Sequence, residues 1–211
     1  MPATKRKKIN PRVERKLTRI SSVREVKQTF LIICEGVNTE PDYFNAFRLT
    51  SANVKAVGQG MGTLALVQKA INIKDQEKQK GRIYSQNWVV FDKDDFPEHD
   101  FNSAISLARQ HGFEVAYSNQ AFEFWFLLHF NLYQGALHRS RYEKMLTVLL
   151  GFPYTKKTGV SSKMFNALFF KQEQAINHAK TIMKQFDGNN PAQQESSTTV
   201  YLLVEELNKF L

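Results

Sequence analysis

Short apolar runs alternate with amphipathic segments from residue 29 onward. The runs at 29–34, 53–57, 87–92 and 113–118 have the length and the β-branched or aromatic content of buried strands. Apolar residues between them recur at helical spacing, which predicts helices from Thr39, from Thr63 to about Lys80 and from about His99 to Gln110. Strands and helices that alternate at these distances indicate an α/β fold, with a mainly parallel four-stranded sheet flanked by helices.

The pattern becomes helical after Asn119. The segment 121–133 is apolar almost all round, which predicts a helix buried between layers. Further helices are expected at 139–151, over most of 165–186 and at 198–211. Between them, 152–163 is expected to be a loop, with strand pieces as the alternative, and 187–197 is expected to be a polar loop. We therefore expect an α/β core (29–118), a mostly helical C-terminal part (119–211) packed on it, and an N-terminal arm (1–28).

Charge sets the N-terminal arm apart from the rest of the chain. The 211 residues include 29 Lys and Arg against 20 Asp and Glu, a formal net charge of +9, and ten of the basic but only two of the acidic residues lie within 1–28. Three interpretations stay open for the arm. It binds nucleic-acid phosphates non-specifically, it docks on a partner protein through an amphipathic segment at 13–26, or it is a solubilising tail. The nucleic-acid candidates within it are Lys5, Arg6, Lys7, Lys8 and Arg12.

Several protein classes are excluded by composition. The chain has no run of 18 apolar residues, so a transmembrane helix is not expected, and no apolar segment follows the charged N-terminus as in a secretory signal. A single cysteine, Cys34, excludes an internal disulfide framework and a cysteine-rich zinc site. We expect a cytoplasmic protein in which Cys34 lies buried in a strand.

Acidic residues fall where two of the predicted strands end. Glu35 lies at the carboxyl end of the first strand, and Asp92, Asp94 and Asp95 lie at the carboxyl end of the third. The carboxyl ends of parallel strands meet at one edge of a sheet, so these carboxylates are expected to converge there. Carboxylates in one place repel and suit Mg²⁺ or Mn²⁺, one or two of which could assist in-line attack on a phosphodiester. The alternative is that 92–95 is only a polar turn.

Three segments resemble a known family. ICEGVNTEPDYF (33–44), VVFDKDD (89–95) and SNQAFEFWFLLHF (118–130) are similar, in this order, to the RloB-like family of TOPRIM-related proteins, to which the AbiL phage-resistance component also belongs. The resemblance runs from about residue 29 to the end, although Gln120 stands where it predicts a proline. It implies a TOPRIM-like Rossmannoid core, a Mg²⁺-dependent nuclease site, a role in bacterial antiphage defence and a partner ATPase of the AAA or ABC type.

The resemblance also implies residue roles. Glu35 would be the acid/base and metal-facing carboxylate, Asp92 and Asp94 the principal metal ligands, and Asp95 a reserve acid. Glu40 is either a second-metal ligand or a helix-start acid favoured by the helix dipole. Glu123, an acid in an apolar helix, is either a metal ligand or half of an internal ion pair.

Other polar residues have weaker signals. His129 lies six positions after Glu123, on another helical face, so we expect a core histidine with a hydrogen bond rather than a ligand. Tyr154, Lys156 and Lys157 suit a phosphate, with a solvated basic loop as the alternative. The glycine-rich 58–62 lacks the Lys-Ser/Thr of a P-loop, and we interpret it as a turn in reach of nucleic-acid backbone.

These signals together predict a Mg²⁺- or Mn²⁺-dependent nuclease that cuts RNA, with tRNA among its candidate substrates, during abortive infection. One alternative is a non-catalytic nucleic-acid-binding or sensor subunit in which the carboxylates hold a structural ion. Another is a HAD-type phosphohydrolase with Asp92 as nucleophile, although that family's motif normally follows the first strand of its core.

Overall fold

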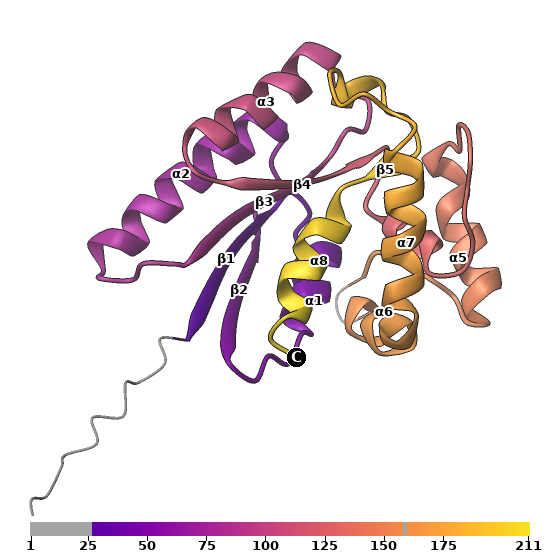
Figure 1. Cartoon of the computed structure of the whole chain (residues 1–211), viewed down its shortest axis with the longest axis horizontal. Coiled ribbons are helices and arrows are strands. Elements are labelled where there is room, and N and C mark those ends of the chain that lie inside the picture. Colours follow the sequence, from indigo (N-terminus) through magenta and orange to yellow (C-terminus); the bar gives the residue numbers. More distant parts are fainter. Residues whose placement is uncertain (1–26, 158–159) are drawn as a thin grey trace, which may run out of the picture.

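A five-stranded sheet forms the centre of the computed structural model, which describes residues 27–157 and 160–211 (Figure 1). The first four strands are parallel and the last is antiparallel to its neighbour, in the spatial order β2-β1-β3-β4-β5. The strands are β1 (Gln28–Cys34), β2 (Ala52–Gly58), β3 (Gln86–Asp92), β4 (Glu114–Asn119) and β5 (Ser197–Thr198). The expected α/β fold with a mainly parallel sheet is confirmed, and the expected count of four strands is wrong.

The fifth strand, β5, lies where the sequence predicted a polar loop (187–197) to pass into a helix (198–211). It is held to β4 by side-chain as well as backbone bonds, because the Tyr117 N–H donates to Thr199 Oγ1 at 2.9 Å and the Thr199 N–H donates to the Tyr117 carbonyl at 2.8 Å. Ser118 Oγ and Thr198 Oγ1 lie 3.0 Å apart. A two-residue polar strand carries no apolar alternation, so the sequence pattern gave no sign of it.

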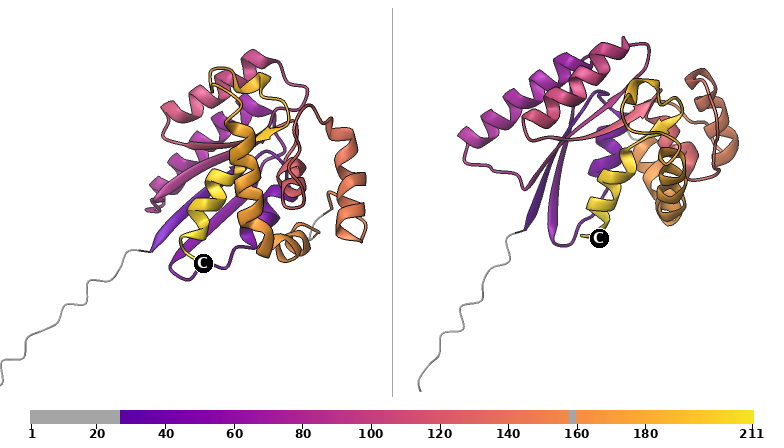
Figure 2. Two further views of the ribbon diagram at one scale, coloured as in Figure 1. Left: turned by 45° about the vertical axis from the view of Figure 1, so that its right-hand side comes forward. Right: turned by 45° about the horizontal axis from the view of Figure 1, so that its top comes forward.

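Alternate residues of the strands pack under two helical layers (Figures 1 and 2). Leu31 and Ile33 of β1 face α2 (Thr63–Gln79) and α3 (Glu98–Gln110), which lie side by side on one face of the sheet. Phe30, Ile32 and the buried Cys34 face the other side, which is covered by α1 (Thr39–Asn45) and α8 (Val200–Asn208) among others. This two-sided burial explains the continuous apolar run in β1.

The remaining helices lie on the same face as α1 and α8. They are α4 (Glu123–Leu128), α5 (Tyr142–Leu150), α6 (Val160–Leu168) and α7 (Gln172–Met183). Every residue of α4 is buried, as expected, but the helix is shorter than predicted, and its last turn is closed by the His129 ring, whose Nδ1 lies 2.9 Å from the Trp125 carbonyl oxygen. Across the described ranges, no helix is long and apolar enough to cross a membrane.

The helix predicted over 165–186 is divided in two. A 3₁₀ turn at Phe169–Lys171 separates α6 from α7, and α6 begins inside the segment predicted to be a loop. The division lets the two helices pack in different places: Phe165 of α6 meets Tyr43 and Phe47 edge-on at 5.6 and 4.6 Å between ring centroids, while α7 packs on α4 and α8. Tertiary packing therefore overrides the continuous helical pattern of the sequence.

The outer edge of the sheet at β2 is covered at one point by a side-chain amide. Asn45, the last residue of α1, accepts a hydrogen bond from the Ala56 N–H through Oδ1 and donates one to the Ala56 carbonyl through Nδ2, both at 3.1 Å. The amide thereby satisfies both backbone groups of Ala56 in the place where a further strand would pair.

Candidate functional site

The strand ends bring Glu35 and Asp92 together, as the parallel sheet predicts. β1 pairs directly with β3, and the Glu35 N–H continues the ladder by donating to the Val90 carbonyl at 2.9 Å. The Asp92 N–H in turn donates to Glu35 Oε2 at 3.0 Å. The first strand and the third strand therefore deliver their carboxylates to the same edge of the sheet.

These carboxylates line a pocket of about 270 Å³ at the carboxyl ends of β1 and β3. We call it the carboxylate pocket. Its walls come from the loop after β1, from the end of β3, from the start of α4 and from the segment after α5. Five acids and one cation line it: Glu35, Glu40, Asp92, Asp94, Glu123 and Lys156. The excess of negative charge is what a bound cation would balance.

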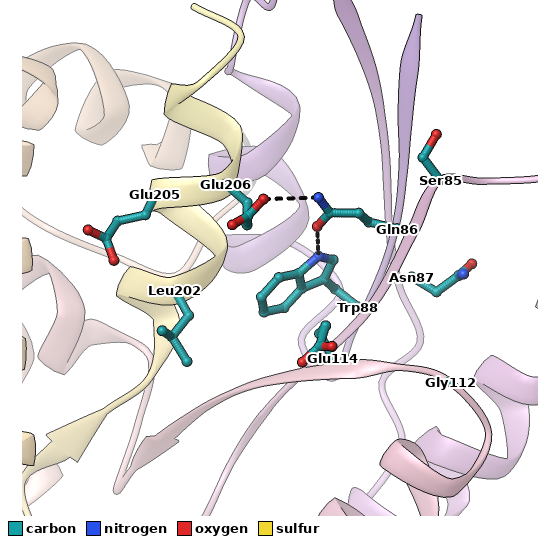
Figure 3. Close-up of a pocket in the computed structure, with 9 residues that line it drawn as sticks. All are labelled: Ser85, Gln86, Asn87, Trp88, Gly112, Glu114, Leu202, Glu205 and Glu206. Atoms are coloured by element: carbon teal, nitrogen blue, oxygen red, sulfur yellow. Dashed lines mark hydrogen bonds between the residues drawn. The ribbon is translucent and has the colours of Figure 1, made fainter. Parts of the chain in front are cut away.

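A larger pocket of about 470 Å³ lies at the opposite end of the sheet, beside α8 (Figure 3). Three of its polar side chains are linked by hydrogen bonds: Gln86 donates to Glu206 Oε2 at 3.0 Å and accepts from Trp88 Nε1 at 2.9 Å. None of the site residues predicted from the sequence lines it. The larger of these two pockets is therefore not the one that holds the acids singled out from the sequence.

Glycine at position 36 lets the carboxylate of Glu40 fold back over the loop after β1. The Gly36 N–H donates to Glu40 Oε1 at 3.1 Å, and a Cβ at residue 36 would lie only 2.1 Å from Glu40 Oε2. Glu40 itself is buried in the first turn of α1. Burial raises the pKa of its carboxyl group, opposed by the two backbone N–H donors, its own and that of Gly36.

Asp92 carries the least satisfied carboxylate of the pocket. Its Oδ2 accepts a hydrogen bond from the Phe122 N–H at 3.1 Å, whereas Oδ1 is buried and has no hydrogen-bond partner in the described part of the chain. Burial raises the pKa of Asp92 well above its ordinary value, and the charges of Glu40 and Glu123 add to this. A buried carboxylate oxygen without a donor is costly unless a cation or a ligand reaches it.

The pKa of Glu35 is also raised, to about 7. Burial is the largest cause, the hydrogen bond from the Asp92 N–H lowers the pKa, and the negative charges of Asp94 and Glu40 raise it. Burial thus raises the pKa of Glu35, Glu40 and Asp92 alike, and the negative charges around these three groups add to the effect.

Glu123 forms an internal ion pair, which is one of the two roles that the sequence left open for it. Its Oε1 accepts a hydrogen bond from Tyr154 Oη at 2.9 Å and lies 3.1 Å from Lys156 Nζ. Tyr154 is buried, and burial raises the pKa of its hydroxyl, followed by the charge of Glu123. The hydroxyl of Tyr154 is therefore engaged by Glu123, and Lys156 is the basic residue that lines the carboxylate pocket.

Asp94 and Asp95 turn toward an arginine that the sequence did not single out. Arg139 Nη1 donates to Asp94 Oδ1 and Nη2 donates to Asp95 Oδ2. Asp94 has a φ of +42° and still lines the pocket, whereas Asp95 is 83% exposed and lies outside it. Arg139 is one of 29 basic residues and lies 45 positions from Asp94, so no local signal distinguishes it.

The other predicted residues lie elsewhere. His129 is a core histidine, as expected: it is fully buried, with its Nδ1 at the Trp125 carbonyl, and it does not line the carboxylate pocket. Lys157 is exposed and outside that pocket. In the glycine-rich segment, Gly58 ends β2 and Gly62 precedes α2. The arm candidates Lys5, Arg6, Lys7, Lys8 and Arg12 lie outside the described residues.

The residue types of the carboxylate pocket suit a divalent cation, but their side chains are not arranged as a complete set of metal ligands. Hard oxygen donors surround it, and Asp92 Oδ1 is buried without a donor. Within 27–157 and 160–211, however, no three His, Cys, Asp or Glu side chains are grouped so as to hold a metal ion. Asp94 is engaged by Arg139, and Glu123 by Lys156. A cation would have to draw at least one of these acids away from its present partner.

Comparison with known proteins gives one match. No curated protein and no solved structure matches the chain. The family model described as RloB-like protein matches residues 30–207, which span β1 to α8 and include every acid of the carboxylate pocket. Because the match covers well over half of the chain, the chain belongs to the RloB-like protein family.

Proposed function

We propose that this protein is a divalent-metal-dependent nuclease with a TOPRIM-like core. The observation that carries the proposal is the buried, unpartnered Asp92 Oδ1 in a pocket shared with four other carboxylates. Membership of the RloB-like family supports it, together with the position of Glu35 after the first strand and of Asp92 and Asp94 after the third. We extend the proposal to cleavage of RNA, including tRNA, in the cytoplasm during antiphage defence, beside an ATPase partner.

Glu35, Asp92 and Asp94 are the residues that would hold one or two Mg²⁺ or Mn²⁺ ions, with Glu40 and Glu123 within the same pocket. A bound ion neutralises charge on a phosphodiester and lowers the pKa of a water molecule. The chain itself supplies the rest. Glu35 accepts a proton from the attacking oxygen, and the Phe122 N–H and Asp92 N–H fix the two main carboxylates in place. Asp94 leaves Arg139 to complete the ligand set.

The proposal is tested by replacing the central acid with its amide. Asp92→Asn keeps the shape and the hydrogen bond from Phe122 but removes the charge, so Mn²⁺ affinity measured by calorimetry should fall by more than about 100-fold, beyond the usual loss for an outer-shell partner. Cleavage of cellular RNA with Mg²⁺ or Mn²⁺ should be abolished. The matched control is Asp75→Asn, on the exposed side of α2, which should behave as the wild type. Undiminished cutting and metal binding by Asp92→Asn would refute the proposal.

A second candidate is a non-catalytic nucleic-acid-binding subunit. The ion pairs of Asp94 and Asp95 with Arg139 favour it, because they satisfy two of the acids without a metal. This candidate predicts that the wild type binds RNA, cuts neither RNA nor DNA with any divalent ion, and shows no change in RNA affinity on Asp92→Asn. The cleavage assay, together with a measurement of RNA affinity, therefore separates the candidates.

A further inference from the structure

The outward side of α5 forms a groove that the carboxylate chemistry does not use. The groove has a volume of about 480 Å³, and we call it the α5 groove. α5 lies at the margin of the molecule, away from the sheet (Figure 1). Its inward residues Tyr142 and Leu146 are buried in the core, and its outward side carries mixed apolar and basic side chains. The lining includes Tyr133, Arg141, Lys144, Met145, Val148 and Leu149.

The floor of the α5 groove is apolar and accessible. Val148 is 74% exposed, and Met145 and Leu149 are partly buried beside it. Tyr133 adds an aromatic ring, which packs at 6.5 Å between centroids on Phe124 of the core. A flat apolar and aromatic floor of this kind suits the face of an unstacked base.

The rim of the groove carries two basic side chains. Arg141 and Lys144 are exposed and form no ion pair with any described residue, unlike Arg139 two positions earlier, although Glu143 lies between them in the first turn of α5. Two exposed cations beside an apolar floor match the alternating phosphates and bases of a nucleic acid.

One short segment of the chain reaches from the α5 groove to the carboxylate pocket. The 3₁₀ turn Arg139–Arg141 connects them: Arg139 contacts Asp94, which lines the pocket, while Ser140 and Arg141 line the groove. A strand that lies in the groove would therefore continue past Arg139 into the carboxylate pocket.

We propose that the α5 groove binds unpaired nucleotides next to the cleaved phosphate, so that the substrate is a single-stranded nucleic acid. This inference rests on the proposed nuclease function and specifies its substrate class. Arg141 and Lys144 contact phosphates, and the Met145–Val148–Leu149 floor receives a base. A duplex keeps its bases stacked inside and cannot fill an apolar floor, so single-stranded RNA binds more tightly than the same sequence as a duplex.

The test measures RNA binding by the full-length protein, using fluorescence anisotropy without divalent ions. Each phosphate contact to a single strand changes the salt slope by about 0.7, so Arg141→Gln/Lys144→Gln should lower the slope by about 1.4 and the affinity by about 25-fold near 0.1 M salt. Lys69→Gln/Lys78→Gln removes the same charge from α2, on the other face of the sheet, and should match the wild type. Circular dichroism should show unchanged folding, because all four residues are exposed.

A second pair of variants tests the floor. Val148→Asn should weaken single-strand binding by about tenfold without altering the salt slope, because an apolar contact with the base rather than a charge is lost. Ile83→Asn, also on an exposed apolar residue, is the control and should have no effect. Duplex RNA should be insensitive to Val148→Asn.

Three results would overturn the inference. Equal losses of RNA affinity in the Arg141/Lys144 and Lys69/Lys78 variants would indicate that RNA responds only to overall charge. Equal effects of the groove variants on duplex and single-stranded RNA would rule out a preference for unpaired bases. Unchanged RNA binding in every groove variant would show that the α5 groove does not bind RNA and would favour a partner protein as its ligand. Because binding is measured without metal, failure of the nuclease proposal would appear separately, as intact groove binding without cleavage in Mg²⁺ or Mn²⁺.

Discussion

Replacing Glu35 by glutamine should stabilise the metal-free protein at alkaline pH. The Glu35 carboxyl group has a pKa raised from 4.5 to about 7, chiefly by burial, so its charged form is unfavourable in the folded state. Glutamine keeps the acceptor for the Asp92 N–H but carries no charge. An acid whose charged form is disfavoured by burial and by neighbouring negative charges should therefore weaken the fold when it ionises.

The magnitude follows from the difference between the two pKa values. Below about pH 4.5 Glu35 is protonated in both the folded and the unfolded chain and has no effect on stability. Between 4.5 and 7 only the unfolded chain ionises, so the wild type loses stability as the pH rises, and above 7 the loss is complete. The shift corresponds to about 3.4 kcal/mol. Because Glu35 is partly solvent-exposed, we expect about 2 kcal/mol at pH 8.

The assay is urea unfolding of both proteins at pH 4.5 and pH 8 with EDTA present. The difference in free energy of unfolding should be below about 0.5 kcal/mol at pH 4.5 and about 2 kcal/mol in favour of Glu35→Gln at pH 8. Glu114→Gln, on an exposed glutamate at the start of β4, is the matched control and should stay within about 0.5 kcal/mol at both values. Saturating Mn²⁺ should raise the stability of the wild type more than that of the variant.

The reasoning would be refuted by a Glu35→Gln protein that is less stable than the wild type at pH 8, or by a difference that is the same at both pH values. The first result would mean that the negative charge is favourable in the metal-free pocket. The second would mean that the effect comes from packing and not from ionisation.

Two further predictions concern the frame around the carboxylate pocket. Burial lowers the pKa of His129 from 6.5 to about 4, so the contribution of His129 to folding stability is fully present above pH 6.5 and is lost as the pH drops toward 4. His129→Asn keeps a donor for the Trp125 carbonyl, and its free energy of unfolding relative to the wild type should rise by about 3 kcal/mol between pH 7 and pH 4, as measured by urea unfolding. Gly58→Ala would place a Cβ 2.2 Å from the Gly36 carbonyl oxygen, so it should cost about 1–3 kcal/mol. Gly62→Ala should destabilise the protein less than Gly58→Ala, because its Cβ would first meet the Phe96 ring at 3.2 Å. Equal losses in the free energy of unfolding for the two variants would contradict the crowding argument.

The meeting of Glu35 and Asp92 could be predicted from the sequence because it depends only on strand identity. Two buried runs, each followed by an acid, are enough once adjacent parallel strands share a sheet edge. The burial of Cys34 and the four parallel strands follow from the same pattern.

The partners of the acids could not be predicted in this way. Arg139 reaches Asp94 from a 3₁₀ turn 45 residues away, and Lys156 reaches Glu123 from a segment that the sequence assigned to a loop. Both pairings depend on how the C-terminal helices fold back over the sheet, which local periodicity does not encode. β5 was missed for a related reason, since its register is set by hydroxyl contacts with β4 and not by apolar residues.

The outer edge of β2 is where a strand from another molecule would be expected to pair, because free edge groups are a template for aggregation. At Ala56 the carboxamide of Asn45 already occupies both the donor and the acceptor. An incoming strand would have to displace that amide before it could extend the ladder through the middle of β2. One side chain at the end of α1 thus blocks the pairing of a further strand at the middle of β2.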